Sequence, residues 1–254
     1  MAGRDAPAPF VRRAQHLRSL HFSLTTVQSR MDVRHPDALA LDYTRLMMGF
    51  LLLQPAPRHI AMLGLGGGSL AKFCHRHLPG ADITVVEIDR AVIALRHDFL
   101  LPPDSDRFRV LEGDGAAYVA GCSASVDVLL VDGYDADGLA ASISSPAFYG
   151  DAARALVDGG VFVTNLSVEA HVFERQLTTI ERALGPGTFA TAATGGANRV
   201  VLSQHGADAP LVLPAPRRPE GFDVPAWNTL RRGFARLHAA ARAHSPADGS
   251  TRRG

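Results

Sequence analysis

The sequence predicts an α/β fold built around a doubly wound, mainly parallel sheet. Five short apolar segments alternate with segments of helical periodicity through the middle of the chain, and this alternation is typical of a parallel sheet with helices on both faces. Two later segments, residues 188–194 and 199–203, are joined by a glycine pair. We therefore expect the last strand to run antiparallel. The first apolar segment, residues 60–65, leads directly into a glycine-rich turn.

Each predicted element is placed by the spacing of its apolar residues and by the glycine, proline or acidic residues that end it. The predicted parallel strands span residues 60–65, 83–87, 108–112, 126–131 and 161–166. The predicted helices of this region span residues 70–77, 91–99, 145–156 and 172–184.

The two ends of the chain carry weaker patterns, which predict accessory structure around one main domain. The alternation in residues 19–31 predicts a small hairpin, and residues 36–53 and 226–243 each have apolar residues at helical spacing. The expected organisation is a disordered start (1–10), a small N-terminal hairpin and helix (11–57), the main α/β domain (58–206), a C-terminal extension with a helix (207–244) and a disordered tail (245–254).

Composition excludes several classes of function. The 254 residues are 46% hydrophobic and carry a net charge of +1, which suits one large core and gives no basic field for a nucleic acid. No apolar run is long enough to span a membrane and the N-terminus lacks the apolar core of a signal peptide, so we expect a cytoplasmic protein.

Cys74 and Cys122 are far apart, which indicates neither a disulfide framework nor a zinc site. Cys74 is expected in the core.

Several histidines and arginines are expected to lie in solvent. His75 and His77 are two residues apart on a predicted helix and so point to different sides, which does not suit a shared metal ion. A solvated helix face is also expected for the arginines of the predicted C-terminal helix, Arg231, Arg232, Arg236 and Arg242. An acidic partner is the alternative for these arginines.

Acidic residues follow the predicted strands at their carboxyl ends. Glu87 ends the second strand about twenty residues beyond the glycine turn, which is the spacing at which a carboxylate accepts hydrogen bonds from a ribose. Asp114, Asp132 and Asp135 follow the third and fourth strands. Because the ligand crevice of an open parallel sheet lies outside these strand ends, the four carboxylates are expected to converge there.

The glycine turn indicates a nucleoside cofactor of the adenosyl type. Its pattern is Gly64-x-Gly66-x-x-Ser69, so the third glycine of the dinucleotide fingerprint is missing and nicotinamide binding is disfavoured. A carboxylate at Asp114 can accept from an adenine amino group. The alternative for Asp114 is the N-cap of a helix that follows the strand.

Taken together, residues from about 19 to 203 resemble the spermidine synthase family, the polyamine aminopropyltransferases. The segments that carry the resemblance are Val27-Gln28-Ser29, Asp42-Tyr43, the glycines Gly64, Gly66, Gly67 and Gly68, Val86-Glu87-Ile88-Asp89, Gly113-Asp114-Gly115 and Asp132-Gly133-Tyr134-Asp135. The resemblance implies a class I methyltransferase-like, Rossmann-like fold preceded by a small β-region, often dimeric, in which residues 58–206 bind an adenosyl cofactor. It implies no metal.

The resemblance also implies roles for individual residues. Glu87 would hold the ribose of decarboxylated S-adenosylmethionine, Asp114 the adenine and Gln28 the thioadenosine part, with Asp132 at the attacking amine. The remaining cofactor contacts would come from the turn residues and the residue after Asp114, namely Gly64, Gly66, Gly67, Gly68, Ser69 and Gly115.

The expected chemistry is a single displacement in which a neutral amine attacks the carbon beside a sulfonium. A carboxylate such as Asp132 can orient the amine and accept its proton directly or through water. Asp135 would be a second acceptor in the same pocket. The alternative for this pair is a turn cap after the strand.

Some positions depart from the family pattern, and they leave the acceptor and the transferred group open. Ser69 stands where the family has an aspartate that would bind the aminopropyl nitrogen, and its loss relaxes selection against ordinary S-adenosylmethionine. Thr44 and Arg45 replace residues that grip a diamine in the family, and an arginine repels a polyamine. Candidate acceptor contacts are Tyr43, Arg45 and Tyr134.

Two alternatives to aminopropyl transfer to an amine therefore stay open at this point. One is an S-adenosylmethionine-dependent methyltransferase acting on an unassigned small molecule, which Ser69 favours. The other is a nucleoside-binding module without catalytic activity.

Overall fold

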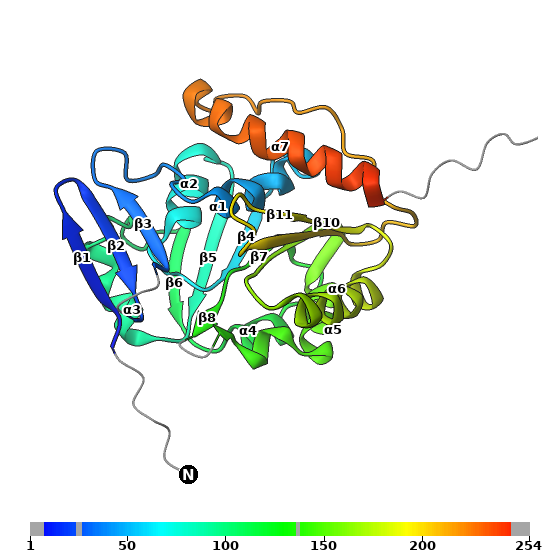
Figure 1. The fold of residues 1–254 in the computed structure, drawn as a ribbon, viewed down its shortest axis with the longest axis horizontal. Coiled ribbons are helices and arrows are strands. Elements are labelled where there is room, and N and C mark those ends of the chain that lie inside the picture. The colour runs from blue at the N-terminus through cyan, green and yellow to red at the C-terminus, as the bar shows by residue number, and fades with distance from the viewer. Residues whose placement is uncertain (1–7, 24–26, 136–137, 245–254) are drawn as a thin grey trace, which may run out of the picture.

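The computed structural model describes residues 8–23, 27–135 and 138–244 of the chain. A seven-stranded sheet runs through the centre with helices on both faces, and a three-stranded sheet formed by the start of the chain lies beside it (Figure 1). The long C-terminal helix α7 (Val224–His244) crosses the top of this arrangement (Figure 1).

The central sheet confirms the predicted doubly wound architecture. Its strands are β4 (His59–Leu63), β5 (Asp82–Glu87), β6 (Phe108–Glu112), β7 (Val126–Val131), β10 (Leu156–Leu166), β11 (Thr188–Ala192) and β12 (Arg199–Gln204). They are ordered β11-β12-β10-β7-β4-β5-β6. The five strands from β10 to β6 are parallel, whereas β12 is antiparallel to both of its neighbours.

The strand order places a ligand crevice in the middle of the sheet. After β4, the chain proceeds to β5 and β6 on one side and then returns to β7 on the other side of β4. This reversal is the topological switch point of a doubly wound sheet, and the loops at the carboxyl ends of β4 and β7 diverge there. The central strands are apolar because both faces are covered: all six residues of β7 are buried.

Two layers of helices cover the sheet. One apolar cluster packs α4 (Gly115–Ala120), α5 (Pro146–Ala155) and α6 (Ala170–Leu184) on one face. The other cluster packs α1 (Asp42–Met47), the 3-10 helix η1 (Met48–Leu52), α2 (Ser69–His77), α3 (Arg90–Ala94) and α7 (Val224–His244) on the opposite face. Two short 3-10 segments, η2 (Leu95–His97) and η3 (Ala141–Ser144), and a small ladder of β8 (Tyr134–Asp135) and β9 (Gly138–Leu139) complete the described elements.

The N-terminal sheet contains one strand more than the sequence predicts. The expected hairpin is present as β2 (Leu17–His21) paired with β3 (Ser29–Asp32). A further strand, β1 (Phe10–Ala14), pairs antiparallel with β2. The sequence analysis did not predict β1, because it follows an alanine- and proline-rich segment and is stabilised by pairing with β2.

A buried lysine ties this small sheet to the main domain. The ammonium group of Lys72 in α2 lies 2.7 Å from the carbonyl oxygen of Phe99 and 2.9 Å from the sulfur of Met31 in β3. Burial lowers the pKa of Lys72 to about 7. The contact holds β3 against the start of α2, next to the glycine turn.

The helix expected over residues 36–53 begins later, at Asp42, because Leu41 has an extended backbone. Helix α7 packs against α1 and the following η1 at two glycines, one in η1 and one in α7. A Cβ atom at Gly49 would lie 2.4 Å from the side chain of Leu237, and one at Gly233 would lie 3.4 Å from the carbonyl oxygen of Arg45. The two helices therefore approach closely, which brings α7 within reach of residues at the start of α1.

Candidate active site

A cavity of about 830 Å³ opens at the carboxyl ends of the central strands. The loops after β4, β5, β6, β7 and β10 line it, together with residues of β3, α1 and the β11–β12 turn. The cavity is lined by most of the residues that the sequence nominates: Gln28, Tyr43, Gly64, Gly66, Gly67, Ser69, Glu87, Asp114, Gly115 and Asp132. The contacts of these residues with a bound molecule stay predictions.

The glycine turn brings the end of β4 against the end of β7. Gly64 has a φ of +93°, and a Cβ atom there would lie 2.4 Å from the backbone oxygen of Asp132. Gly67 approaches β3, because a Cβ atom on it would lie 2.5 Å from the hydroxyl of Ser29. Gly68 also has a positive φ of +65° at the start of α2, but it packs on Leu101 and does not line the cavity.

Glu87 ends β5 with its carboxylate held by the backbone of two loops. One oxygen accepts from the N–H of Leu65 at 2.8 Å, and the other accepts from the N–H of Asp89 at 2.9 Å. The side chain is 8% exposed, and that exposure faces the cavity. Each carboxylate oxygen has further lone pairs, so this fixed group is able to accept hydrogen bonds from a diol.

Asp114 caps helix α4, as one of the two sequence interpretations expects. Its Oδ1 atom accepts from the N–H of Ala116 at 2.9 Å, and the residue also lines the cavity. The cap uses one oxygen, so the role at an adenine stays compatible with it. Helical periodicity alone does not predict α4, because Gly115–Ala120 is too short to show it.

Asp132 is the first residue after β7 and lies at the cavity floor. Its Oδ2 atom accepts from the hydroxyl of Tyr43 at 3.0 Å, and its Oδ1 atom accepts from the amide nitrogen of Asn165 at 2.9 Å. Protein encloses the carboxyl group on the sides away from the cavity, and this burial raises its pKa, although Asn165 and Tyr43 act in the opposite direction. The raised pKa makes Asp132 a better proton acceptor than an exposed aspartate.

Asn165 is a site residue that the sequence analysis missed. It lies near the end of β10, 3% exposed, in a strand that is otherwise apolar at this end apart from the neighbouring Thr164. A polar pair at the carboxyl end of a buried strand is the signal that could have identified it.

Two predicted site residues, the substrate contact Tyr134 and the second proton acceptor Asp135, have side chains outside the described part of the structure. The backbone of Tyr134 and Asp135 forms β8, but the placement of these two side chains is not described. Their expected roles stay predictions.

The structure does not bring Arg45 into the cavity with the other candidate acceptor contacts. Its guanidinium donates to the carbonyl oxygens of Leu39 at 3.0 Å and Ala40 at 3.1 Å, and the residue does not line the cavity. These two carbonyls precede α1, and the side chain of Arg45, in the last turn of this short helix, reaches back to them. The neighbouring residues Tyr43 and Thr44 do line the cavity.

The expectation of a solvated face fails at one arginine of the C-terminal helix. Arg236 lies against α1, where it forms an ion pair with Asp42 at 2.7 Å. His77 is also not solvated, because it is 8% exposed and stacks on Phe222 with ring centroids 4.9 Å apart. Sequence spacing shows which residues share a helix face, but not what packs on that face. The core position expected for Cys74 is confirmed.

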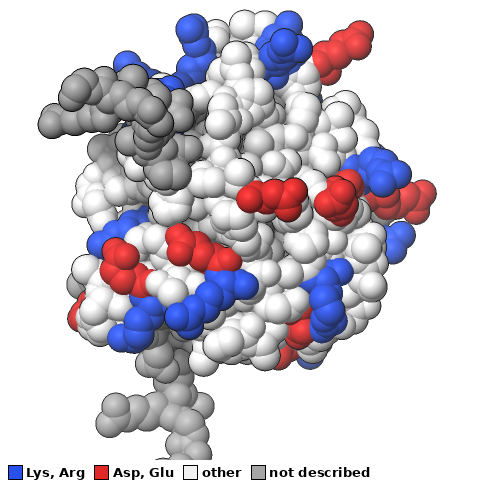
Figure 2. Space-filling view, turned by 90° about the vertical axis from the view of Figure 1, so that its right-hand side faces the viewer, with Lys and Arg blue, Asp and Glu red and all other residues white. Residues whose placement is uncertain are grey.

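The surface and the helices of the described residues show further features that bear on function. On the face drawn in Figure 2, lysine and arginine side chains are interspersed with aspartate and glutamate. Within residues 8–23, 27–135 and 138–244, no helix has the length and apolar character needed to cross a membrane. In the same part of the chain, no three His, Cys, Asp or Glu side chains are grouped as metal ligands.

Comparison with known families decides the relationship of this chain. The family described as Spermine/spermidine synthase domain matches residues 41–192, which contain the glycine turn, Glu87, Asp114 and Asp132. The chain belongs to the spermine/spermidine synthase family. A member named polyamine aminopropyltransferase from Chromobacterium violaceum is 46% identical over 151 residues, which are 59% of this chain and 58% of that protein. The chain thus spans less than two thirds of the length of this relative.

Solved structures of spermidine synthases share the fold. A probable spermidine synthase from Corynebacterium glutamicum aligns with a TM-score of 0.68 over 96% of this chain and 94% of that chain, at 16% identity. A spermidine synthase in complex with the transition-state analogue AdoDATO aligns with a TM-score of 0.61 over 89% of this chain and 87% of that chain, at 18% identity. The class I methyltransferase-like fold expected for the family is confirmed.

Proposed function

We propose that this member of the spermine/spermidine synthase family transfers an aminopropyl group from decarboxylated S-adenosylmethionine to an amine. The observation that carries the proposal is the position of Asp132. It faces the same cavity as the nucleoside-binding candidates Glu87 and Asp114, and two hydrogen-bond donors hold its carboxylate. The name of the Chromobacterium relative, polyamine aminopropyltransferase, supports this choice of reaction.

The residues of the cavity divide into a nucleoside half and an acceptor half. Glu87 ends β5 and Asp114 lies shortly after β6, so they lie on one side of the switch point between β4 and β7. Asp132, Tyr43 and Asn165 lie on the other side, at the ends of β7 and β10 and in α1. A cofactor laid across the switch point would have its nucleoside over β5 and its sulfonium near Asp132.

In the proposed reaction the amine nitrogen forms a bond to the propyl carbon attached to sulfur. The carbon–sulfur bond breaks, its electron pair stays on the sulfur, and 5′-methylthioadenosine leaves as a neutral thioether. The attacking nitrogen must give up a proton, which Asp132 accepts directly or through water. Tyr43 and Asn165 orient the Asp132 carboxylate, so that the acceptor amine meets it in one geometry.

Product mass tests the proposal most directly. The protein is incubated with decarboxylated S-adenosylmethionine or with S-adenosylmethionine and a pool of primary amines, and the products are identified by mass spectrometry. We expect products that carry an added aminopropyl group and formation of 5′-methylthioadenosine. Only methylated products would instead indicate a methyltransferase and would contradict the proposal.

The role of Asp132 is tested by Asp132→Asn, with Asp82→Asn as the matched control. Asp82 is exposed and is the first residue of β5, at the end of the strand away from the cavity. We expect the first variant to lower kcat by about a hundredfold or more and the control to leave it unchanged. Full activity of Asp132→Asn would contradict the assignment.

A further inference from the structure

A second carboxylate faces the acceptor half of the cavity. Asp42 is the first residue of α1 and lines the cavity beside Tyr43, whose hydroxyl reaches Asp132. Asp42 is thus the sequence neighbour of the tyrosine that contacts Asp132. A pair of carboxylates in one pocket is suited to a substrate with two ammonium groups, if both carboxylates are available to it.

Asp42 is already occupied by partners from the C-terminal half of the chain. Its Oδ2 atom accepts from the N–H of Thr194 at 2.7 Å and from the guanidinium of Arg236 at 2.7 Å. Arg45 lies 3.7 Å from the other oxygen. Burial raises the pKa of Asp42, but Thr194 and Arg236 outweigh it and the net effect is a lowered pKa. Asp42 is thus paired with two arginines that lie behind the cavity lining.

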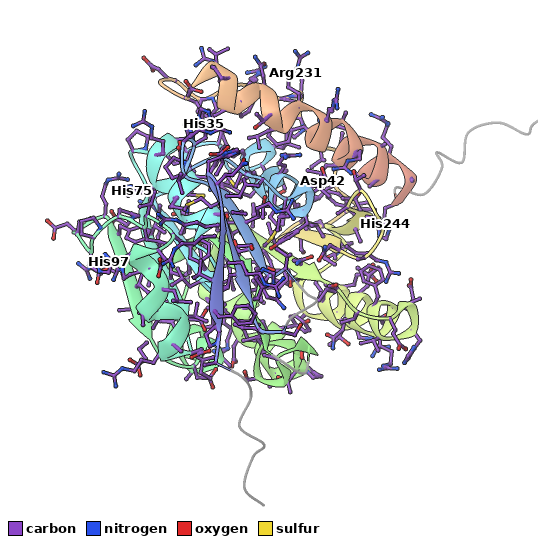
Figure 3. The ribbon with its side chains drawn as sticks, turned by 60° about the vertical axis from the view of Figure 1, so that its left-hand side comes forward. His35, Asp42, His75, His97, Arg231 and His244 are labelled. Carbon is purple, nitrogen blue, oxygen red and sulfur yellow. The ribbon has the colours of Figure 1, made fainter. Side chains whose placement is uncertain are left out.

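Helix α7 holds Arg236 in this position. The second Nη atom of Arg236 donates to the hydroxyl of Thr194 at 3.0 Å, so the guanidinium bridges α1 and the β11–β12 turn. Figure 3 shows Asp42 on the inner side of α7 and Arg231 of the same helix on the outer side. Thr194 also lines the cavity. Arg236 therefore acts on the cavity wall through two residues that face it.

We propose that Arg236 is a specificity-determining residue that occupies Asp42 and thereby selects an acceptor amine whose far end carries no positive charge. This inference rests on the proposed aminopropyl transfer. Suitable acceptors have one reacting amine and a neutral or anionic tail.

The carboxylates of the described cavity lining leave no partner for a second ammonium. Glu87 and Asp114 lie in the nucleoside half, and Asp132 faces the reacting amine. A distal ammonium near Asp42 would meet a carboxylate already paired with Arg236, and it would lie close to like charges. Like charges in a pocket of this kind oppose binding, whereas a neutral or anionic tail avoids this cost.

The test compares three acceptors that share a four-carbon chain: 1,4-diaminobutane, butylamine and 4-aminobutanoate. We expect the wild-type protein to have a higher kcat/KM for the latter two than for the diamine. Arg236→Gln should raise the ratio of diamine to butylamine by about tenfold or more, because it frees the Asp42 carboxylate. Arg231→Gln makes the same chemical change on the outer side of α7 and should leave the ratio unchanged.

Two further variants separate charge from loss of packing. Arg236→Lys keeps the cation and should keep the wild-type preference. The double variant Asp42→Asn with Arg236→Gln lacks the freed carboxylate, so it should lose the gain toward the diamine. A general loosening of α7 would instead give the same shift with and without the Asp42 carboxylate, and this result would overturn the inference.

Failure of the inference and failure of the proposed function give different results. A wild-type protein that forms aminopropylated product and prefers the diamine by tenfold overturns the inference alone, whether or not any variant folds. An unchanged ratio in a folded Arg236→Gln protein does the same. Absence of aminopropylated product from every amine overturns the proposed function, and the inference with it.

Discussion

Replacing Asp132 by asparagine should make the ligand-free protein more stable. The substitution removes a buried negative charge and keeps the shape of the side chain. The asparagine oxygen can accept from Asn165, and its amide nitrogen can donate to the phenol oxygen of Tyr43, which now accepts. Both contacts of the wild-type carboxylate, at 2.9 and 3.0 Å, therefore have a counterpart in the variant.

The size of the effect follows from the balance at this carboxylate. Burial dominates the environment of Asp132 and raises its pKa, so the folded protein favours the neutral form. Two hydrogen bonds offset part of the desolvation, and we expect a remaining gain of about 1–3 kcal/mol in the free energy of unfolding at about pH 8. For a chain of this length, that corresponds to a rise in Tm of about 2–10 °C.

The gain should depend on pH in a defined direction. Because the pKa of Asp132 is higher in the folded than in the unfolded protein, protonation favours folding. That contribution is fully present below the unfolded pKa and is lost as pH rises through the folded pKa. The difference between Asp132→Asn and wild type is thus largest above the folded pKa, and it shrinks as pH falls toward the ordinary carboxyl range.

Urea unfolding of both proteins at a series of pH values from about 5 to about 9 measures this difference. Asp82→Asn, which removes an exposed carboxylate at the other end of the sheet, serves as the control and should show little change. A less stable Asp132→Asn protein at about pH 8 would refute the reasoning. A gain that stays constant across the pH series would refute it as well.

Three further substitutions test the site and the turn that positions it. Tyr43→Phe should lower kcat/KM about tenfold. The Tyr43 hydroxyl lowers the pKa of Asp132, so its removal should raise that pKa and move the acidic limb of the pH–rate profile to higher pH. Glu87→Gln should weaken binding of 5′-methylthioadenosine about tenfold or more by calorimetry, whereas Glu112→Gln, in register on the neighbouring strand but outside the cavity, should not. Gly64→Ala should cost about 2–3 kcal/mol of stability in urea, because its φ is +93° and the added Cβ would meet backbone; Gly80→Ala, with open space around it, should be mild. Equal effects in a variant and its control, or an unmoved pH profile, would contradict these assignments.

Much of the fold could be predicted because its signals are local. Each strand of the parallel sheet is an apolar run, and each long helix has apolar residues at helical spacing, so their order in the chain implies the sheet. Two elements gave no such signal. Strand β1 contains two adjacent arginines in place of an apolar run, and helix α4, with six residues, is too short for helical periodicity.

The candidate site was predictable to the extent that backbone topology places it. Glu87, Asp114 and Asp132 lie at or just after the carboxyl ends of parallel strands, and these ends share one side of the sheet. The direction of a long side chain is not set by topology. Arg45 therefore proved to turn away from the cavity, and Arg236 to pair with Asp42 instead of facing solvent.

The sequence by itself determined the doubly wound sheet, the glycine turn and the acidic residues at the strand ends, because period, spacing and backbone geometry are properties of short segments. Only the tertiary structure decided which groups hold Asp132 and which neutralise Asp42. In the sequence, Tyr43 precedes β7 and Asn165 follows it. Arg236 lies 194 residues from Asp42. Contacts over such separations form only when the strands of the sheet have paired and α1 and α7 have packed on it.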